Sequence, residues 1–340
     1  MKRKFFSHIF PWIVTCTALY VAFKDIDWSE LFSHIQQASK AWLGIAVGCT
    51  IVSYFMRARR WQLLFPSIIM DFWKSYQVLV LGFFMNNVLP ARAGEFVRAH
   101  MGAKVGKESR TLVLATIASE RLADGVTLSL FFVVFALGMG DQHTSQSLLY
   151  VAYLFLFATA SVALVLLNRA AIFIIADKIH ARVDSKASKY AAERIQIFLN
   201  GLAPLYSRHK LPLLVIWSII IWCIELFVYV SIGRAYSASL SLQSCVLFMV
   251  TVNFSSLIPA APGGIGVIEA VTSAVLVSIG VPKEQALSMV MTQHFIQYAV
   301  IGAPGLLFML NWKKTINAVV TDESLDGSGK QAEPSAGLDR

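Results

Sequence analysis

Polar and charged side chains interrupt an apolar run at 86–99, where the sequence reads NNVLPARAGEFVRA. Arginine is typical of phosphate binding because it forms paired hydrogen bonds with phosphate oxygens. A helix broken by proline and glycine also leaves backbone N–H groups free to bind an anion. We interpret this stretch as a candidate phosphate site, and the alternative is a cytoplasmic loop near lipid headgroups. Its candidate residues are Asn87, Pro90, Arg92, Gly94, Glu95 and Arg98.

A second charged group, Glu120, Arg121 and Asp124, lies inside the apolar segment 111–138. Each ionised group costs about 2.5–3.5 kcal/mol at the centre of a bilayer, so these side chains must pair and face protein or water. Arg121 and Asp124 have the spacing for a pair on one helix face, which leaves Glu120 for Arg92 or Arg98. The group fits either a lipid site or a network of ion pairs that only holds helices together.

The stretch IPAAPGGIGVIEA at 258–270 repeats the pattern P-A-x-x-G at the end of an apolar run. About thirty residues after each copy there is a polar cluster with the same internal spacing. The first cluster contains Glu120, Arg121 and Asp124, and the second contains Gln293, His294 and Gln297. We interpret the two stretches as an internal repeat. The candidate residues of the second copy are Asn253, Pro259, Pro262, Gly263, Gly264, Gly266, Glu269, Gln293 and His294.

Three ionisable residues in the second half each have two interpretations. Glu269 would lie in the first turn of a helix, where the helix dipole stabilises a carboxylate, so capping is its alternative role. His294 is either a proton-linked switch or a core histidine with its hydrogen bonds satisfied. Glu225 is the only charged residue of the apolar segment 212–233, where it either carries a proton or satisfies a polar neighbour.

The composition predicts an all-α polytopic membrane protein. Hydrophobic residues make up 56% of the chain and charged residues 14%, and the mean hydropathy is +0.63. We expect about eight spanning helices plus one or more re-entrant hairpins, and a short interfacial helix at 28–37. The apolar segments are 5–23, 41–56, 76–89, 111–138, 148–167, 212–233, 242–258, 266–281 and 286–310.

Basic residues predict the orientation of the segments. They are concentrated after the second apolar run, where they include Arg57 and Arg60, in the loop 168–211, and after the last run. We therefore place these regions and both termini in the cytoplasm of a cell whose inner membrane holds the protein. The segment 76–89 is short and has basic flanks on both sides, so we interpret 76–105 as a hairpin that enters from the cytoplasm.

The chain is predicted to form one membrane domain over 1–320, followed by a polar, disordered tail at 321–340. The repeat halves cover about 41–167 and 212–310, and 168–211 is a cytoplasmic linker. By the predicted orientation 111–138 runs outward and 286–310 runs inward, so the two halves have inverted topology. Inverted repeats of this kind build binding sites from interrupted helices near the middle of the membrane.

Other function classes find little support. The net charge of +9 fits cytoplasmic loops of a membrane protein better than a nucleic-acid-binding surface. The four cysteines lie in apolar runs without the spacing of a metal site, and no metal or cofactor is expected. The sequence also lacks the motifs of hydrolases, metalloproteases and nucleotide-binding enzymes, so no catalytic residue is predicted.

The stretches NNVLPARAGEFVRA, ASERLADG, IPAAPGGIGVIEA and SIGVPKEQAL, taken in order, resemble the lysylphosphatidylglycerol synthase transmembrane-region family, also called flippase-like membrane proteins. The resemblance covers about 76–310 and implies movement of a polar lipid between leaflets. It carries over the candidate residues above, apart from Asn253 and from Gln293 and His294; these last two stand where the family often has an arginine. Two-domain members also contain a soluble aminoacyltransferase domain, whereas only a short tail follows residue 310 here.

We therefore expect a flippase-like transporter for a phosphate-bearing or otherwise polar lipid, and no enzyme activity. The expected partners are membrane lipids, namely an anionic phospholipid, a hopanoid or a lipid-linked sugar, with no nucleic acid. A homo-oligomer and a complex with envelope-biogenesis enzymes both remain open. Two alternatives for the function are an intramembrane transferase that uses a lipid-linked donor and a non-transporting scaffold for envelope assembly.

Overall fold

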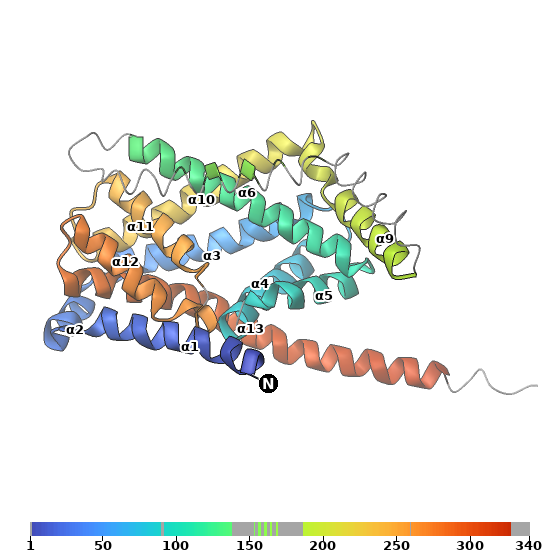
Figure 1. Cartoon of the computed structure of the whole chain (residues 1–340), viewed down its shortest axis with the longest axis horizontal. Coiled ribbons are helices and arrows are strands. Elements are labelled where there is room, and N and C mark those ends of the chain that lie inside the picture. The colour runs from blue at the N-terminus through green and yellow to red at the C-terminus, as the bar shows by residue number, and fades with distance from the viewer. Residues whose placement is uncertain are drawn as a thin grey trace, which may run out of the picture.

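The computed structural model describes residues 2–89, 92–137, 186–258 and 260–327, together with single positions between 153 and 168. Every regular element in these ranges is a helix, which confirms the all-α prediction for this part of the chain (Figure 1). Most of the predicted segment 148–167, much of the predicted linker and residues 328–340 of the predicted tail lie outside the described residues.

Two helices form the N-terminal part. The helix α1 (Lys2–Phe23) is followed by α2 (Trp28–Gln37), whose predicted bounds are confirmed. The Asp27 side chain accepts hydrogen bonds from the backbone N–H groups of Ser29 and Glu30, and this cap explains why α2 begins at Trp28. Leu31 of α2 is completely buried and packs with Leu287 in a small core.

The first half of the fold contains α3 (Lys40–Leu63), α4 (Phe72–Val88), α5 (Gly94–Gly106) and α6 (Arg110–Leu137). The helices α4 and α5 pack against each other across the break, so the predicted hairpin is present as a pair of helices. Close contact requires glycine, because a Cβ added to Gly94 would lie 2.2 Å from the carbonyl oxygen of Gly82.

The second half contains α10 (Lys210–Ala235), α11 (Leu242–Ser255), the short 3₁₀ helix η3 (Pro262–Gly264), α12 (Val267–Ser278) and α13 (Lys283–Gly327). Before it lie α9 (Lys186–Gly201) and η2 (Ala203–Tyr206), and α9 packs along α6. The helix α13 continues to Gly327, which lies within the stretch predicted as tail.

Corresponding helices of the two halves make corresponding contacts. The helix α3 packs against α10, which is its counterpart in chain order. The helix α4, which follows α3, packs against α13. In the same way α11, which follows α10, packs against α6. In each half the helix after the break packs against the next helix: α5 packs on α6, and α12 packs on α13.

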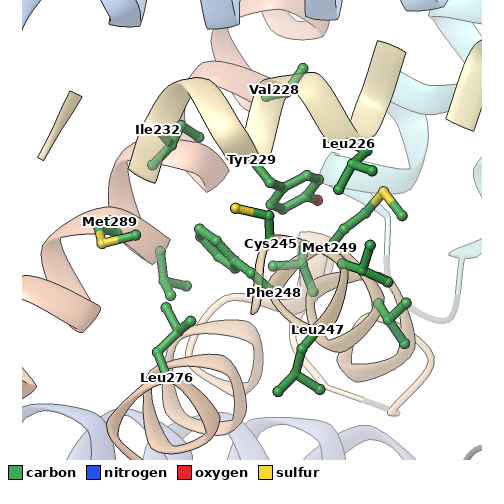
Figure 2. Packing of buried hydrophobic residues seen from close by; sticks show 14 of the residues in the cluster. Leu226, Val228, Tyr229, Ile232, Cys245, Leu247, Phe248, Met249, Leu276 and Met289 are labelled. Atoms are coloured by element: carbon green, nitrogen blue, oxygen red, sulfur yellow. The ribbon is translucent and has the colours of Figure 1, made fainter. Parts of the chain in front are cut away.

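Two large apolar cores are centred on the two halves, and each also includes side chains from the other half. Trp61, Leu79 and Ile117 are almost fully buried in the core of the first half. In the second half the side chains of α10 and α11 meet, and Tyr229 contacts the edge of Phe248 with ring centroids 4.9 Å apart (Figure 2). Figure 2 also shows Leu276 and Met289 beside this cluster, so α12 and α13 belong to the same core.

Three of the described helices are long and apolar enough to cross a membrane. They cover Lys40–Leu63, Lys210–Ala235 and Lys283–Trp312. Shorter apolar helices cover Phe10–Phe23, Leu242–Ser255 and Pro262–Ser278. The predicted number of about eight spans therefore stays a prediction, whereas the membrane-protein character is clear from these helices.

Candidate functional site

Six buried charged side chains from four helices form one network. Arg98 of α5 donates to Glu120 of α6 over 2.6 Å, and Arg60 of α3 donates to Asp124 of α6 over 2.7 Å. Arg60 also lies 4.0 Å from Glu120, so it joins the two carboxylates. The network continues from Asp124 to Arg57 of α3, at 3.5 Å, and from Arg57 to Glu225 of α10, at 3.0 Å.

The network has three arginines and three carboxylates, so its formal charges cancel. All six side chains are buried, and Arg60 and Glu120 are completely inaccessible. Neutral groups satisfy more of their hydrogen-bonding capacity: Ser218 accepts from Arg60 over 2.9 Å, and Trp222 donates to Asp124 over 3.2 Å. Buried charges are tolerated only when they are paired and hydrogen-bonded in this way.

The pairing of the second charged group differs in part from the prediction. Glu120 pairs with Arg98, which is one of the two expected partners. Asp124 pairs with Arg60 and Arg57 rather than with Arg121, so the prediction of an Arg121–Asp124 pair is wrong. The reason is that α3 brings two arginines to the face of α6 on which Asp124 lies.

Sequence reasoning missed Arg57 and Arg60 as members of the site. Their basic character placed them in a cytoplasmic flank, but α3 continues to Leu63 and buries both inside the fold. Their spacing of three residues could have revealed them, because it places both guanidinium groups on one helix face. The isolated Glu225 then supplies a matching carboxylate on α10, where it also accepts a hydrogen bond from Ser53 over 2.7 Å.

A second group of charges at the break between α4 and α5 is partly exposed. Arg121 donates from Nε to Glu95 over 2.8 Å, and Nε of Arg92 lies 4.0 Å from the same carboxylate oxygen. The exposed fractions are 29% for Arg121, 27% for Glu95 and 38% for Arg92. Two arginines therefore share one carboxylate, which leaves a formal charge of +1 on the group.

The backbone at this break is unusual. Arg92 has a φ of 54°, in the left-handed region that side chains with a Cβ seldom adopt. Asn87 is half-buried in the last turn of α4, and Gly94 begins α5 in close contact with Gly82. The candidate residue Pro90 lies outside the described residues.

The second break, between α11 and α12, contains glycines that its geometry requires. Gly263, Gly264 and Gly266 all have φ between 73° and 87°. A Cβ added to Gly263 would lie 1.3 Å from the hydroxyl oxygen of Tyr298, so no larger residue fits there. Pro262 is the first residue of η3, and Pro259 lies outside the described residues.

Glu269 and His294 join the second break to α13. Oε1 of Glu269 lies 2.5 Å from Nδ1 of His294, and Oε2 of Glu269 accepts from the backbone N–H of Gly266 over 2.7 Å. Nε2 of His294 lies 3.2 Å from the carbonyl oxygen of Gly263. The predicted capping role of Glu269 is thus present, and the same carboxylate also contacts the histidine.

Polar side chains connect the second group with α10. Gln293 donates to the hydroxyl of Tyr229 over 3.3 Å, and Tyr229 also forms a hydrogen bond with Asn253. Asn253 donates to the carbonyl oxygen of Met249 over 2.8 Å, one turn earlier in α11. These candidate residues therefore lie at the junction of α10, α11 and α13, one helical turn of α10 away from Glu225.

The two broken segments lie next to each other, because α4 contacts η3. The candidate residues thus form two groups on adjacent breaks: an arginine-rich one on α5 and α6, and a glycine-rich one with Glu269 and His294. Of the first group, Arg98, Glu120 and Asp124 are buried in the neutral network, whereas Arg92, Glu95 and Arg121 remain partly exposed.

An apolar cavity of about 460 Å³ lies between α6 and α10, on a side that the sequence motifs do not mark. Leu122 and Val126 of α6 face Leu214 and Val215 of α10 across it. Ser218, which also lines the cavity, is the residue that accepts a hydrogen bond from Arg60. The cavity wall therefore touches the buried charge network at this serine.

Comparison with known proteins shows to which family the chain is similar. The model of the family described as the lysylphosphatidylglycerol synthase TM region matches residues 9–305. A UPF0104 membrane protein of Pyrococcus horikoshii is 24% identical over 303 residues, which are 81% of this chain and 87% of the relative. Together with the apolar helices, these matches identify a multi-pass membrane protein. The chain belongs to the lysylphosphatidylglycerol synthase transmembrane-region family.

Proposed function

We propose that this protein moves a polar-headed, anionic lipid between the two leaflets of a membrane. One observation carries the proposal: Arg92 and Arg121 share a single carboxylate, Glu95, and all three are partly exposed. The unmatched positive charge lies at a helix break, where it would attract a phosphate group. Because both arginines are partly exposed, N–H groups that do not bond Glu95 can reach a ligand.

The neighbouring network supports a division of roles among the arginines. Arg98, Arg60 and Arg57 are buried and matched by three carboxylates, so their charges hold α3, α5, α6 and α10 together. This assignment differs from the sequence-based expectation for Arg98, which grouped it with the phosphate-binding arginines. We now assign headgroup binding to Arg92 and Arg121, and a positioning role to Glu95.

The contacts between helices support an internal repeat with two-fold symmetry. Among these six helices, exchange of α3 with α10, α4 with α11 and α6 with α13 converts every observed contact into an observed contact, and the α3–α10 contact into itself. The α4–α13 contact becomes the α11–α6 contact, for example. Repeats of this kind place their broken helices at a shared site, which agrees with the contact between α4 and η3.

The two parts of a lipid have suitable surroundings in this arrangement. The headgroup would bind at Arg92 and Arg121, close to both breaks, while its acyl chains stay in the surrounding hydrocarbon. Irregular backbone at membrane depth is stable only beside protein or a water-filled space, which favours a polar path at the breaks. A phospholipid and a phosphate-linked sugar lipid both carry the phosphate group that this site would bind.

The proposal is tested with purified protein in liposomes that contain fluorescent phosphatidylglycerol in both leaflets. A membrane-impermeant quencher added outside reports how fast lipid reaches the outer leaflet. Arg121→Gln and Arg92→Gln are each expected to slow this step about 10-fold or more, because a charge-assisted hydrogen bond contributes about 1.5–3 kcal/mol. The matched control is Arg59→Gln, since Arg59 is an exposed arginine of α3 bonded to Gln62.

The same experiment separates the alternatives. Fluorescent phosphatidylcholine, which has no net charge, should respond less to the two substitutions than phosphatidylglycerol does. Unchanged rates in both variants would exclude the assigned headgroup site. A new covalent lipid product found by mass spectrometry would instead favour an intramembrane transferase.

A further inference from the structure

Both ring nitrogens of His294 face oxygen atoms. Nδ1 lies 2.5 Å from Oε1 of Glu269, and Nε2 lies 3.2 Å from the carbonyl oxygen of Gly263. A carbonyl oxygen can only accept a hydrogen bond, so Nε2 must carry a hydrogen to make this contact. Whether Nδ1 also carries a hydrogen then depends on whether Glu269 is ionised or protonated.

Two arrangements satisfy the remaining contact, and both contain the same number of protons. In the first, Nδ1 also carries a hydrogen and donates to an ionised Glu269. In the second, a protonated Glu269 donates to a neutral imidazole at Nδ1. Either way the pair holds one proton more than a neutral histidine beside an ionised carboxylate, and the pair has no net charge.

The surroundings of the pair favour its uncharged, proton-bound state. The side chains of Glu269 and His294 are 9% and 7% exposed. Among the described residues, Glu269 has no lysine or arginine within ion-pair distance. The ring of Tyr298 on α13 packs edge-on against His294, and the backbone N–H of Gly266 donates to Glu269. The helix α1 also packs here, where Thr15 accepts a hydrogen bond from the N–H of Ala261. Loss of the proton would leave a buried negative charge without a cation.

The pair also connects three elements. Glu269 belongs to α12, His294 to α13 and Gly263 to η3. When the shared proton leaves, the lone pair of Nδ1 faces a carboxylate, and the contact becomes repulsive. The chain at this point contains three glycines with positive φ, so η3 has the backbone freedom to adopt another arrangement.

We propose that Glu269 and His294 form a proton-binding site, and that its proton is exchanged during the lipid movement proposed above. In the loaded state the proton lies between Oε1 of Glu269 and Nδ1 of His294. On release it passes to water on one side of the membrane, leaving ionised Glu269 and a neutral His294 that keeps its Nε2 hydrogen. Uptake from the other side restores the pair, so the gradient of protons supplies energy for the lipid. The coupling rests on the proposed function, whereas the proton site does not.

In the part of the first half that the structure describes, arginine pairs stand where the second half has its histidine. At the corresponding place in the motif, Arg121 pairs with Glu95, and Arg98 pairs with Glu120. Arginine stays charged at every physiological pH, so these pairs hold their charges while the histidine pair changes. In this proposal the first half binds the anionic headgroup and the second half binds the proton.

The proton site is tested directly by ¹⁵N NMR of the full chain in nanodiscs with labelled histidine. The His294 signals are assigned as those missing from the His294→Gln variant. At neutral pH we expect Nε2 to be protonated and Nδ1 to be protonated or strongly hydrogen-bonded, and we expect the Glu269→Gln variant to shift the Nδ1 signal. An Nε2 without a hydrogen, or an Nδ1 signal unchanged in Glu269→Gln, would overturn the proton site.

The matched control for this measurement is the pair of half-buried His34 and exposed Glu30 on α2, in which Nε2 of His34 lies 3.6 Å from Oε1 of Glu30. Glu30→Gln should change the His34 signals only slightly, because 3.6 Å is too long for a hydrogen bond between these two atoms. Thermal unfolding of each variant shows whether it still folds. If His294→Gln fails to fold, Tyr298→Phe gives a second assignment, since its removed hydroxyl group lies beside the break.

The coupling is tested in the liposome experiment with an imposed pH gradient and a pH-sensitive dye inside. In the wild type we expect the gradient to shift the distribution of phosphatidylglycerol and the dye to report proton movement with it. The Glu269→Gln variant should show neither response, whereas His34→Gln should behave as the wild type. Lipid movement that ignores the gradient would overturn the coupling and leave the proposed function intact. Absence of any lipid movement would overturn both, while the NMR result would still decide the proton site.

Discussion

Arg98 of α5 donates a hydrogen bond of 2.6 Å from Nη2 to Oε2 of Glu120 on α6, and almost no surface of either side chain is accessible. The guanidinium group also lies 4.1 Å from the ring centre of Trp61, which closes its other face. Gly82 of α4 leaves room for the arginine, because a Cβ there would lie 2.7 Å from Cβ of Arg98. This pair therefore fixes the hairpin α4–α5 against α6.

Removal of one partner of this pair should be strongly destabilising. Arg98→Met leaves Glu120 buried with a weaker set of cations, and we expect a loss of about 3–5 kcal/mol of unfolding free energy. Thermal or denaturant unfolding in detergent measures the loss. The double variant Arg98→Met with Glu120→Leu should lose less than the sum of the single losses. Glu108→Gln, an exposed control, should have little effect.

Gly94→Ala should weaken the hairpin between α4 and α5. The new methyl group would meet the Gly82 carbonyl oxygen and the Asn86 backbone, so the helices must separate, at a cost of roughly 1–3 kcal/mol. The matched control is Gly48→Ala in α3, where nothing lies within 4 Å of the added atom. That change should stabilise the helix by about 0.5–1 kcal/mol. Equal effects in an unfolding assay would contradict the close contact.

Gly263→Ala should cost more than Gly280→Ala, although both glycines have positive φ. At Gly280 nothing lies within 4 Å of an added Cβ, so only backbone strain of roughly 1–2 kcal/mol is expected. At Gly263 the added atom would also collide with Tyr298, and the two effects add. Comparison of the two unfolding midpoints separates strain from collision, and a smaller loss at Gly263 would argue against the described break.

The cap of α2 predicts a dependence on pH. Hydrogen bonds from the backbone N–H groups of Glu30 and Ser29 lower the pKa of Asp27. A lowered pKa in the folded state means that the contribution is present above the ordinary aspartate range and is lost as the pH falls through the folded pKa. The protection of the first turn of α2 against hydrogen exchange, taken relative to the intrinsic exchange rate at the same pH, should therefore fall in acid. Asp27→Asn should remove this dependence on pH and keep part of the cap.

The sequence allowed some features to be predicted because they depend on neighbouring residues. The bounds of α2 follow from its cap and its apolar face, and the break after Val88 follows from the proline and glycine beyond it. The pairing of Glu120 with Arg98 was one of two expected solutions. The second break was also recognisable, because its glycines show where the backbone needs positive φ.

Other features depend on which helices meet in space. Arg57 and Arg60 were interpreted as flanking basic residues, since one sequence does not show that α3 packs on α6 and α10. For the same reason Asp124 was paired with its neighbour Arg121 rather than with a residue sixty-four positions earlier. The walls of the cavity between α6 and α10 are apolar apart from Thr127 and Ser218, so no pattern of residue types marks it in the sequence.

The exact balance of the buried network has an electrical consequence. Three arginines and three carboxylates sum to zero, so a transmembrane voltage exerts no net force on the network as one body. The group of Arg92, Arg121 and Glu95 has one positive charge, which such a voltage would act on with about 2.3 kcal/mol per 100 mV for a full crossing. A bound headgroup with a single negative charge would cancel it, and the occupied group would then be indifferent to the membrane potential.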